Sequence, residues 1–462
     1  MSSVEELRHD CSALFQFIHR ITACCQERHG PQAYDKASKE FFEYLRALGD
    51  ATLRYLDRFA DSAPKDSDLY YTYRQELWNL RSNWTILHSF IKPATDADTL
   101  QAPTSLLQSL AYRLSTVTGF ALVKFAVFHT NDLNYLQLNT NEIRELAQRL
   151  VQLFPDGPKF PDHLGLIGFP YSQADALFSN ILIAHEMGHY VFQERTNSGA
   201  LGKLTTEVAN AIQNALQPNV ASFKPEHVQW CIKTVFSWTQ ELFCDLFAVQ
   251  LVGPAYSFAY IELFDLVMIL DPAGPSLAHA TEFNASHPAD ALRLREQFRS
   301  LKKNGWWAEI KTTKSHYVEV LKKASSIRDK ALLPPSHPIG RQTLDAFLAA
   351  TPDIHGAISE TLTGIDLGIT EFKQYKRAIA DHLVLGVVPS TLVMNGKPKY
   401  PGMVALINAG YKFYLEEIND LIDNIDGQDK TSARVRREWT NRLERWILKA
   451  LEDSHLLSHQ EV

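Results

Sequence analysis

The sequence has no long apolar run. Its two nearest candidates, residues 120–128 and 383–394, are short and are interrupted by Lys124 and by Pro389, whereas a transmembrane helix needs roughly 18 apolar residues or more. The first residues, Met-Ser-Ser-Val-Glu-Glu-Leu-Arg, also have neither the apolar core nor the cleavage site of a signal peptide. We therefore expect a cytoplasmic chain without a membrane span.

The sequence also has neither a paired cysteine pattern nor an excess of basic residues. It contains five cysteines, an odd number, and no Cys-x-x-Cys pair, which favours free thiols in a reducing compartment. The formal net charge is −7, and nucleic-acid binding would require a basic face. The one dense basic cluster, residues 434–445, is interrupted by Glu438 and Glu444, and we interpret it as a solvated helix face.

What remains is a globular composition, 45% hydrophobic and 21% charged over 462 residues. At roughly 100–200 residues per domain, this length allows two or three domains. Apolar residues recur at helical spacing near the N-terminus; they include Leu7, Cys11, Leu14 and Ile18. The sequence predicts an α+β, predominantly α fold with three consecutive regions. These are a helical N-terminal region (1–105), a central region (106–300) and a helical C-terminal region (301–462).

Within the central region, residues 120–128 and 133–138 resemble two strands joined by a turn at Asn131-Asp132. A helix is expected after Asn139, and residues 164–169 are expected to form an edge strand. Ser172 and Asp175 have the spacing of a capping box, which predicts a helix from residue 172 to about 193. Further helices are expected over 228–251 and, as a pair joined at Gly427, over about 401–457.

The predicted helix after Ser172 contains the sequence His185-Glu186-Met187-Gly188-His189, an HExxH motif. Residues four apart share one face of a helix, so both imidazoles can bind one zinc ion. Glu186 would then lie beside the metal and act as the general base towards a zinc-bound water. A surface helix with two histidines is the alternative, and the apolar flanking residues argue against it.

A tetrahedral catalytic zinc site needs a third protein ligand and an open position. Glu241 and Asp245, also four apart, lie in an otherwise apolar helical segment where unpaired carboxylates are costly. We expect Glu241 to be the third metal ligand and Asp245 to orient a zinc-bound histidine from the second shell. Cys244 is a possible zinc ligand, although its position favours core packing, and a solvent-facing carboxylate pair is the other alternative.

HExxH followed by Glu-x-x-x-Asp resembles the pattern of the gluzincin metallopeptidases. Ala248 extends the match to Glu-x-x-Ala-Asp-x-x-Ala, with Cys244 in place of the first alanine. Downstream, His287-Pro288 is followed by Arg293, which resembles the His-Pro-x4-Arg segment of the HtpX-type and CAAX prenyl peptidases. The resemblance covers residues 172–293, and those families are usually embedded in membranes, so we expect a soluble relative.

The resemblance implies that the segment from His287 to Arg293 lies near the cleft. Stabilisation of an oxyanion requires a hydrogen-bond donor, and His287, Tyr256 and Arg293 can each donate. We name His287 as a candidate catalytic residue and Tyr256 and Arg293 as candidate contacts to the substrate or the transition state. A structural role is the alternative for each of the three.

Together these features predict a zinc metallopeptidase with Zn²⁺ as cofactor and a peptide or protein as substrate. Hydrolysis of a peptide bond follows from the resemblance, while the residues alone indicate metal-assisted hydrolysis. Two alternatives stay open: a regulatory or scaffold protein with a degenerate peptidase site, and a zinc hydrolase of non-peptide amides. The aromatic helical flanks could bind a regulatory protein partner or cover the cleft.

Overall fold

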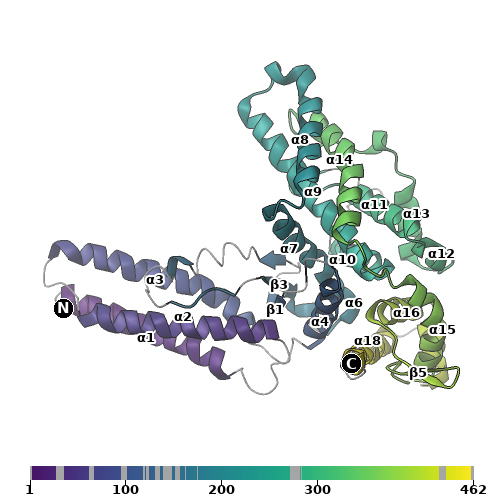
Figure 1. Ribbon diagram of the computed structural model, residues 1–462, viewed down its shortest axis with the longest axis horizontal. Coiled ribbons are helices and arrows are strands. Elements are labelled where there is room, and N and C mark those ends of the chain that lie inside the picture. Colours follow the sequence, from purple (N-terminus) through teal and green to yellow (C-terminus); the bar gives the residue numbers. More distant parts are fainter. Residues whose placement is uncertain are drawn as a thin grey trace. The chain divides into compact units, whose positions relative to one another are not determined.

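The structure of the chain, a computed structural model, is mostly helical, as the sequence predicts (Figure 1). Among the described residues, no helix has the length and apolar character needed to cross a membrane. The described residues are 3–27, 36–61, 67–94, 101–117, 120, 124–130, 136–138, 148–150, 157–161, 163–173, 175–270, 281, 283–425 and 433–458.

The chain divides into two compact units, and this division differs from the three consecutive regions expected from the sequence. The first unit comprises residues 1–104 and 122–174, and the second comprises 105–121 and 175–462. All eight residues that the sequence singles out for chemistry belong to the second unit.

The described residues of the first unit form three long helices and a small sheet. The helices α1, α2 and α3 bury an apolar core that includes Leu14, Leu48 and Trp84; Trp78 and Tyr71 are exposed. Their bounds are α1 Ser3–Glu27, α2 Lys36–Asp61 and α3 Ser67–Ala94. The periodic apolar residues of the N-terminal sequence thus form a helical core, as predicted.

The sheet has the strand order β1-β3-β2, with β1 Lys124–Thr130, β2 Leu136–Leu138 and β3 Leu164–Pro170. Strand β3 pairs in parallel with β1 and antiparallel with β2. The prediction of an edge strand at 164–169 is therefore wrong, because β3 is the central strand. All seven of its residues are buried, which explains the continuous apolar run that local pattern alone leaves ambiguous.

The predicted hairpin is also not formed as expected, because β2 pairs with β3 instead of β1 in the sheet. The expected turn at Asn131-Asp132 and most of the helix expected after Asn139 lie outside the described residues. The same holds for the predicted turn at Gly427.

The second unit is built around α9 (Pro225–Val252), a helix of 28 residues that is buried without interruption from Leu242 to Val249. Helices α7, α8, α11 and α14 all pack against α9. Figure 1 shows α8 and α14 running alongside it. Their bounds are α7 Ile183–Asn197, α8 Gly202–Leu216, α11 Asp290–Lys303 and α14 Gly340–Thr361.

This unit also contains further helices, 3-10 turns and two short strands. The helices and 3-10 turns before α14 are α4 Gln101–Ser115, α6 Leu177–Asn180, η3 Gln217–Ser222, α10 Pro254–Leu270, α12 Trp306–Ile310, α13 His316–Ser325 and η5 Asp329–Ala331. They are followed by α15 Ile369–Val384, β4 Leu392–Met394, β5 Lys397–Lys399, α16 Met403–Glu416, α17 Ile418–Ile425 and α18 Ala433–Ser458. The described residues of the range 401–457 thus form three helices, where two were predicted.

The helix predicted from Ser172 to about Gln193 is interrupted. Tyr171–Gln173 forms a 3-10 turn, α6 covers only four residues, and α7 begins at Ile183. Hydrogen bonds from Leu182 N to Ser179 O and from His185 N to Leu182 O span three residues, and such tight turns mark the end of regular α-helix. The HExxH motif therefore lies in the first turns of α7 and not in the middle of a long capped helix.

Candidate metal centre

The two histidines of the motif face a carboxylate on α9. The Nε2 atom of His185 is 3.4 Å from Oε2 of Glu241, and the Nε2 atom of His189 is 3.5 Å from Oε1 of the same residue. The rings of His185 and His189 are 4.8 Å apart, edge to face. The structure thus brings together the three residues that the sequence predicts as metal ligands.

These separations suit a tetrahedral zinc ion. Ligand atoms at about 2.0–2.1 Å from zinc in tetrahedral geometry lie about 3.3–3.4 Å from one another. The two nitrogen–oxygen distances, each to a different oxygen of Glu241, are 3.4 Å and 3.5 Å and are within about 0.2 Å of that value. The donors, two imidazoles and one carboxylate, are also ligands that zinc accepts at catalytic centres.

The close approach of α7 to α9 brings the donors together, and it depends on Gly188. A Cβ atom at this position would lie 2.9 Å from the Cα atom of Cys244 and 3.2 Å from its Sγ atom. Because Gly188 has no side chain, the backbone of α7 can lie directly against Cys244 of α9. The apolar flanks of the motif supply the rest of this contact, since residues 181–188 are all buried.

Cys244 offers a second possible donor set. Its sulfur and one nitrogen from each histidine all lie within 4.8 Å of one another, while each histidine has one nitrogen within 3.5 Å of a Glu241 oxygen. We favour Glu241, because Cys244 is fully buried and packs against Gly188. Burial, followed by the charges of Glu241, Glu186 and Asp245, raises the pKa of the Cys244 thiol well above its usual value.

Behind His185, Asp245 is fully buried and is held by Arg293. The Nε atom of Arg293 donates to Oδ2 of Asp245 at 2.6 Å, and Nη2 donates to Oδ1 at 2.8 Å. Oδ1 also lies 3.0 Å from Nδ1 of His185. A carboxylate on Nδ1 turns Nε2 towards the metal position, which is the arrangement predicted for Asp245.

Tyr256 and Arg293 lie on the buried side of the site. The Tyr256 hydroxyl donates to Oδ1 of Asp245 at 2.5 Å and lies 3.1 Å from Nδ1 of His185. Both residues are at most 4% exposed, and Nη2 of Arg293 is 3.5 Å from Oε2 of Glu241. Their contacts support His185, Asp245 and Glu241 from within, and they indicate a positioning role rather than the direct substrate contact that was considered from the sequence.

His287 lies at the accessible edge of the site. Its side chain is 49% exposed, and its Nε2 atom is 3.8 Å from Oε2 of Glu241. The Asn284 side chain accepts hydrogen bonds from the backbone N–H groups of Ser286 and His287, and such local bonds fix a tight turn. Trp238 on α9 donates to the carbonyl of Asn284 at 2.8 Å, so the loop is tied to the helix that carries Glu241.

Glu186 directly follows His185 and is 7% exposed. Its charge is among those that raise the pKa of the Cys244 thiol on α9. Glu186, Glu241 and Asp245 supply three carboxylates, and Arg293 supplies one guanidinium. With both histidines neutral, as metal binding requires, the cluster carries two net negative charges, which match the charge of a divalent cation.

The pKa values of the three candidate ligands are set by burial and by these charges. Burial lowers the pKa of His185, but the carboxylates of Asp245 and Glu241 outweigh it and raise the pKa to about 10. Burial and the neighbouring charge of His185 lower the pKa of His189 to about 4. Burial raises the pKa of Glu241, yet His185 and Arg293 outweigh it and lower the value to about 2. His185 therefore carries a proton when no metal is bound, and its charge and that of Arg293 together balance two of the three carboxylates.

His337, the second His-Pro histidine of the sequence, is not part of this cluster and stacks on Trp230 with ring centroids 3.8 Å apart. Sequence reasoning did not foresee the bidentate contact of Arg293 with Asp245.

Comparison of the chain with models of protein families, with curated protein sequences and with solved structures finds no match.

Proposed function

We propose that the chain is a zinc-dependent metallopeptidase in which His185, His189 and Glu241 hold the metal. The observation that carries the proposal is the 3.4 and 3.5 Å separation between the two imidazole nitrogens and the Glu241 carboxylate. The three carboxylates outnumber the single guanidinium of Arg293, and a divalent cation held by two neutral histidines would balance the remaining negative charge. The three ligands leave one tetrahedral position open, which is the arrangement of a catalytic zinc site.

Each residue of the cluster has a defined task in this proposal. When bound, zinc supplies a Lewis acid that polarises the scissile carbonyl and acidifies the attacking water. Glu186 takes the proton from that water and passes it to the leaving amine. Asp245, held by Arg293 and Tyr256, keeps Nε2 of His185 directed at Glu241. His287, at the accessible edge, can donate a hydrogen bond to the developing oxyanion.

The substrate class depends on the gluzincin resemblance of the sequence, because the geometry alone supports only metal-assisted hydrolysis. A zinc hydrolase of non-peptide amides would use the same residues. A scaffold protein that keeps the metal for structure is the second alternative. The buried Glu186 favours an enzyme, since a purely structural site needs no general base.

Metal analysis combined with substitution of Glu186 tests this proposal. We expect the purified protein to contain about one zinc ion per chain, because the ligand set forms a single site. Glu186→Gln should keep the zinc and the fold but lose about 10²–10⁴-fold in kcat. The measurements are elemental analysis and cleavage of a proteome-derived peptide mixture followed by mass spectrometry.

Glu194→Gln is the matched control, since Glu194 lies two turns further along α7 and outside the site. It should keep both zinc and activity. A wild-type protein that takes up no zinc would exclude the metal site altogether. A zinc-loaded protein in which Glu186→Gln has the activity of the wild type would exclude Glu186 as the base and favour the scaffold alternative.

A further inference from the structure

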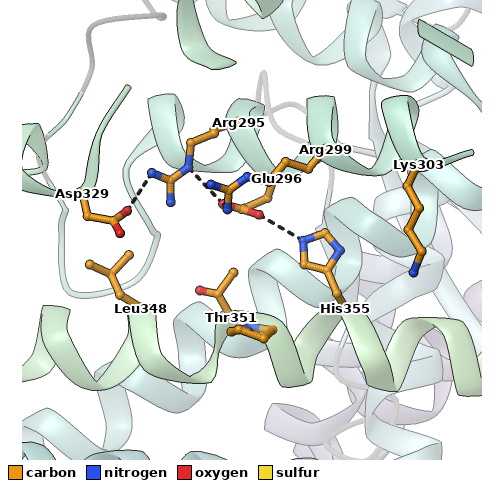
Figure 2. Close-up of a pocket in the computed structure, with 9 residues that line it drawn as sticks. Arg295, Glu296, Arg299, Lys303, Asp329, Leu348, Thr351 and His355 are labelled. Carbon is orange, nitrogen blue, oxygen red and sulfur yellow. Dashed lines mark hydrogen bonds and ion pairs between the residues drawn. The ribbon is translucent and has the colours of Figure 1, made fainter. Parts of the chain in front are cut away.

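A second candidate site lies between α11 and α14, in a cavity of about 480 Å³. It belongs to the second unit and is lined by residues other than the metal ligands. Figure 2 shows side chains from the two helices facing each other across it. Cavities of about 300–1,000 Å³ are the usual size of small-molecule sites.

Helix α11 contributes a row of cations to the cavity. Arg295, Arg299 and Lys303 follow one another at intervals of four residues, so they lie on one face of the helix. Two carboxylates, Glu296 and Asp329, also line the cavity. Three cations against two anions leave a positive charge in the cavity.

Glu296 is fully buried and its oxygens are already occupied. Oε1 accepts from Nε of Arg295 at 3.0 Å and from Nη1 of Arg299 at 2.7 Å, and Oε2 lies 3.0 Å from Nε2 of His355. Burial raises the pKa of Glu296, but His355 and the two arginines outweigh it and lower the pKa. Glu296 therefore acts as an anchor that fixes the two guanidinium groups, and it is not available to a metal ion.

Hydrogen-bond donors remain after these contacts. Lys303 makes no hydrogen bond or ion pair with any described residue, and Arg299 uses only Nη1 within the described part of the chain. Both side chains are exposed to solvent. A guanidinium presents a planar fork of donors and an ammonium adds a point charge, and this combination is typical of phosphate recognition.

We propose that this cavity binds a phosphate group carried by a small molecule. Arg299 and Lys303 would hold the phosphate oxygens, while Arg295 and Glu296 keep Arg299 in place. The rest of the molecule would lie against Leu348 and Thr351 of α14, which line the opposite side of the cavity (Figure 2). This proposal does not depend on the metallopeptidase proposal.

Calorimetric titration of the full chain at constant ionic strength tests it, with inorganic phosphate, phenyl phosphate and benzoate as probes. We expect phosphate and phenyl phosphate to bind, and benzoate, with the same ring but a carboxylate, to bind at least tenfold more weakly. Lys303→Gln and Arg299→Gln should each weaken phenyl phosphate binding at least tenfold. Lys303→Gln leaves the contacts of Glu296 intact, so it keeps the test valid if Arg299→Gln unfolds.

Two controls separate this cavity from other sources of binding. Lys302→Gln removes an exposed charge from the same helix outside the cavity, and it should bind like the wild type. His189→Ala disrupts the candidate metal centre, and it should also bind phosphate like the wild type. The proposal is overturned if no probe binds, if benzoate matches phenyl phosphate, or if Lys302→Gln weakens binding as much as Lys303→Gln. It is equally overturned if binding is lost in His189→Ala and kept in Lys303→Gln.

Discussion

Both carboxylate oxygens of Asp245, a fully buried residue, are occupied. Arg293 donates to both, and Tyr256 donates to one of them. An ionised carboxylate in such a position is costly unless it is paired and hydrogen-bonded, and the bidentate guanidinium meets that condition. The position of the His185 ring therefore depends on a contact between α9 and α11, outside the HExxH motif itself.

The identity of the third metal ligand gives a prediction at the residue scale. Glu241→Ala should abolish tight zinc binding, because it removes the oxygens that face both histidines. Cys244→Ala should keep about one zinc per chain, because we place its sulfur in the helix contact with Gly188. Equilibrium zinc titration of the two variants, with thermal unfolding as a check on the fold, measures the difference.

The spectrum of the cobalt-substituted protein provides an independent check. A thiolate ligand gives an intense sulfur-to-cobalt charge-transfer band in the near ultraviolet, and we expect this band to be absent. If Cys244→Ala lost the metal and Glu241→Ala kept it, the third metal ligand would be Cys244 and not Glu241.

At this scale, residue spacing alone predicted that Glu241 and Asp245 share a face, since four residues make about one helical turn. Spacing within one helix did not predict the partner of Asp245. Arg293 is 48 residues away along the chain, and no local pattern records which helix packs against which. The burial of Tyr256 behind His185 also depends on tertiary packing. The sequence therefore left Tyr256 as a candidate for direct contact with the substrate.

At the scale of the elements, the contact between α7 and α9 gives a prediction for Gly188. Gly188→Ala should lower the melting temperature and weaken zinc binding, because the added Cβ would lie 2.9 Å from the backbone of Cys244. Overpacking of this kind typically costs about 1–3 kcal/mol. It would also separate the histidines on α7 from Glu241 on α9. Thermal unfolding and zinc titration check the two effects.

Gly356→Ala in α14 is the matched control. No atom lies within 4 Å of a Cβ placed at this position, and alanine favours a helix interior over glycine by about 0.5–1 kcal/mol. We expect the control to unfold at an equal or higher temperature than the wild type. If Gly188→Ala behaved like Gly356→Ala, the close helix contact would have no part in forming the site.

Helix α9 was predicted well, over 228–251 against the observed Pro225–Val252, because its long apolar stretch ends at Gly253-Pro254. The helix of the motif was predicted too long. Ser172 and Asp175 have capping-box spacing, but the chain there forms a 3-10 turn and then the four-residue α6. A capping box is a local signal, and it predicts only where a helix begins. The break before Ile183 lies among buried residues, and their tertiary packing cannot be deduced from the local sequence pattern.

At the scale of the whole molecule, the sequence predicted one boundary near residue 105, whereas the chain passes between the two units three times. Residues 1–104 belong to the first unit, 105–121 to the second, 122–174 to the first again, and 175–462 to the second. Within the second unit, Arg113 of α4 donates to the carbonyl of Leu251 at 2.8 Å, and Ser105 donates to Glu452 at 3.0 Å. These contacts link residues more than one hundred positions apart, so composition along the chain gave no sign of them.

The stability of the second unit should depend on pH through Glu444. This side chain of α18 is 5% exposed and accepts a hydrogen bond from the backbone N–H of Phe178 at 3.0 Å. Burial raises its pKa from 4.5 to about 8, against the effect of that hydrogen bond. A carboxyl whose pKa is higher in the folded state stabilises the fold below its unfolded pKa, and this contribution is lost as the pH rises towards 8.

Glu444→Gln should therefore stabilise the protein, and more at pH 8 than at pH 5. The amide oxygen can still accept the hydrogen bond of Phe178 N–H, and no charge has to be buried at either pH. Denaturant unfolding at both pH values, compared between variant and wild type, measures this difference. Glu438→Gln, at an exposed position of the same helix, should show no comparable pH-dependent gain. An equal effect of Glu444→Gln at pH 5 and pH 8 would mean that Glu444 does not change its protonation between them in the folded chain.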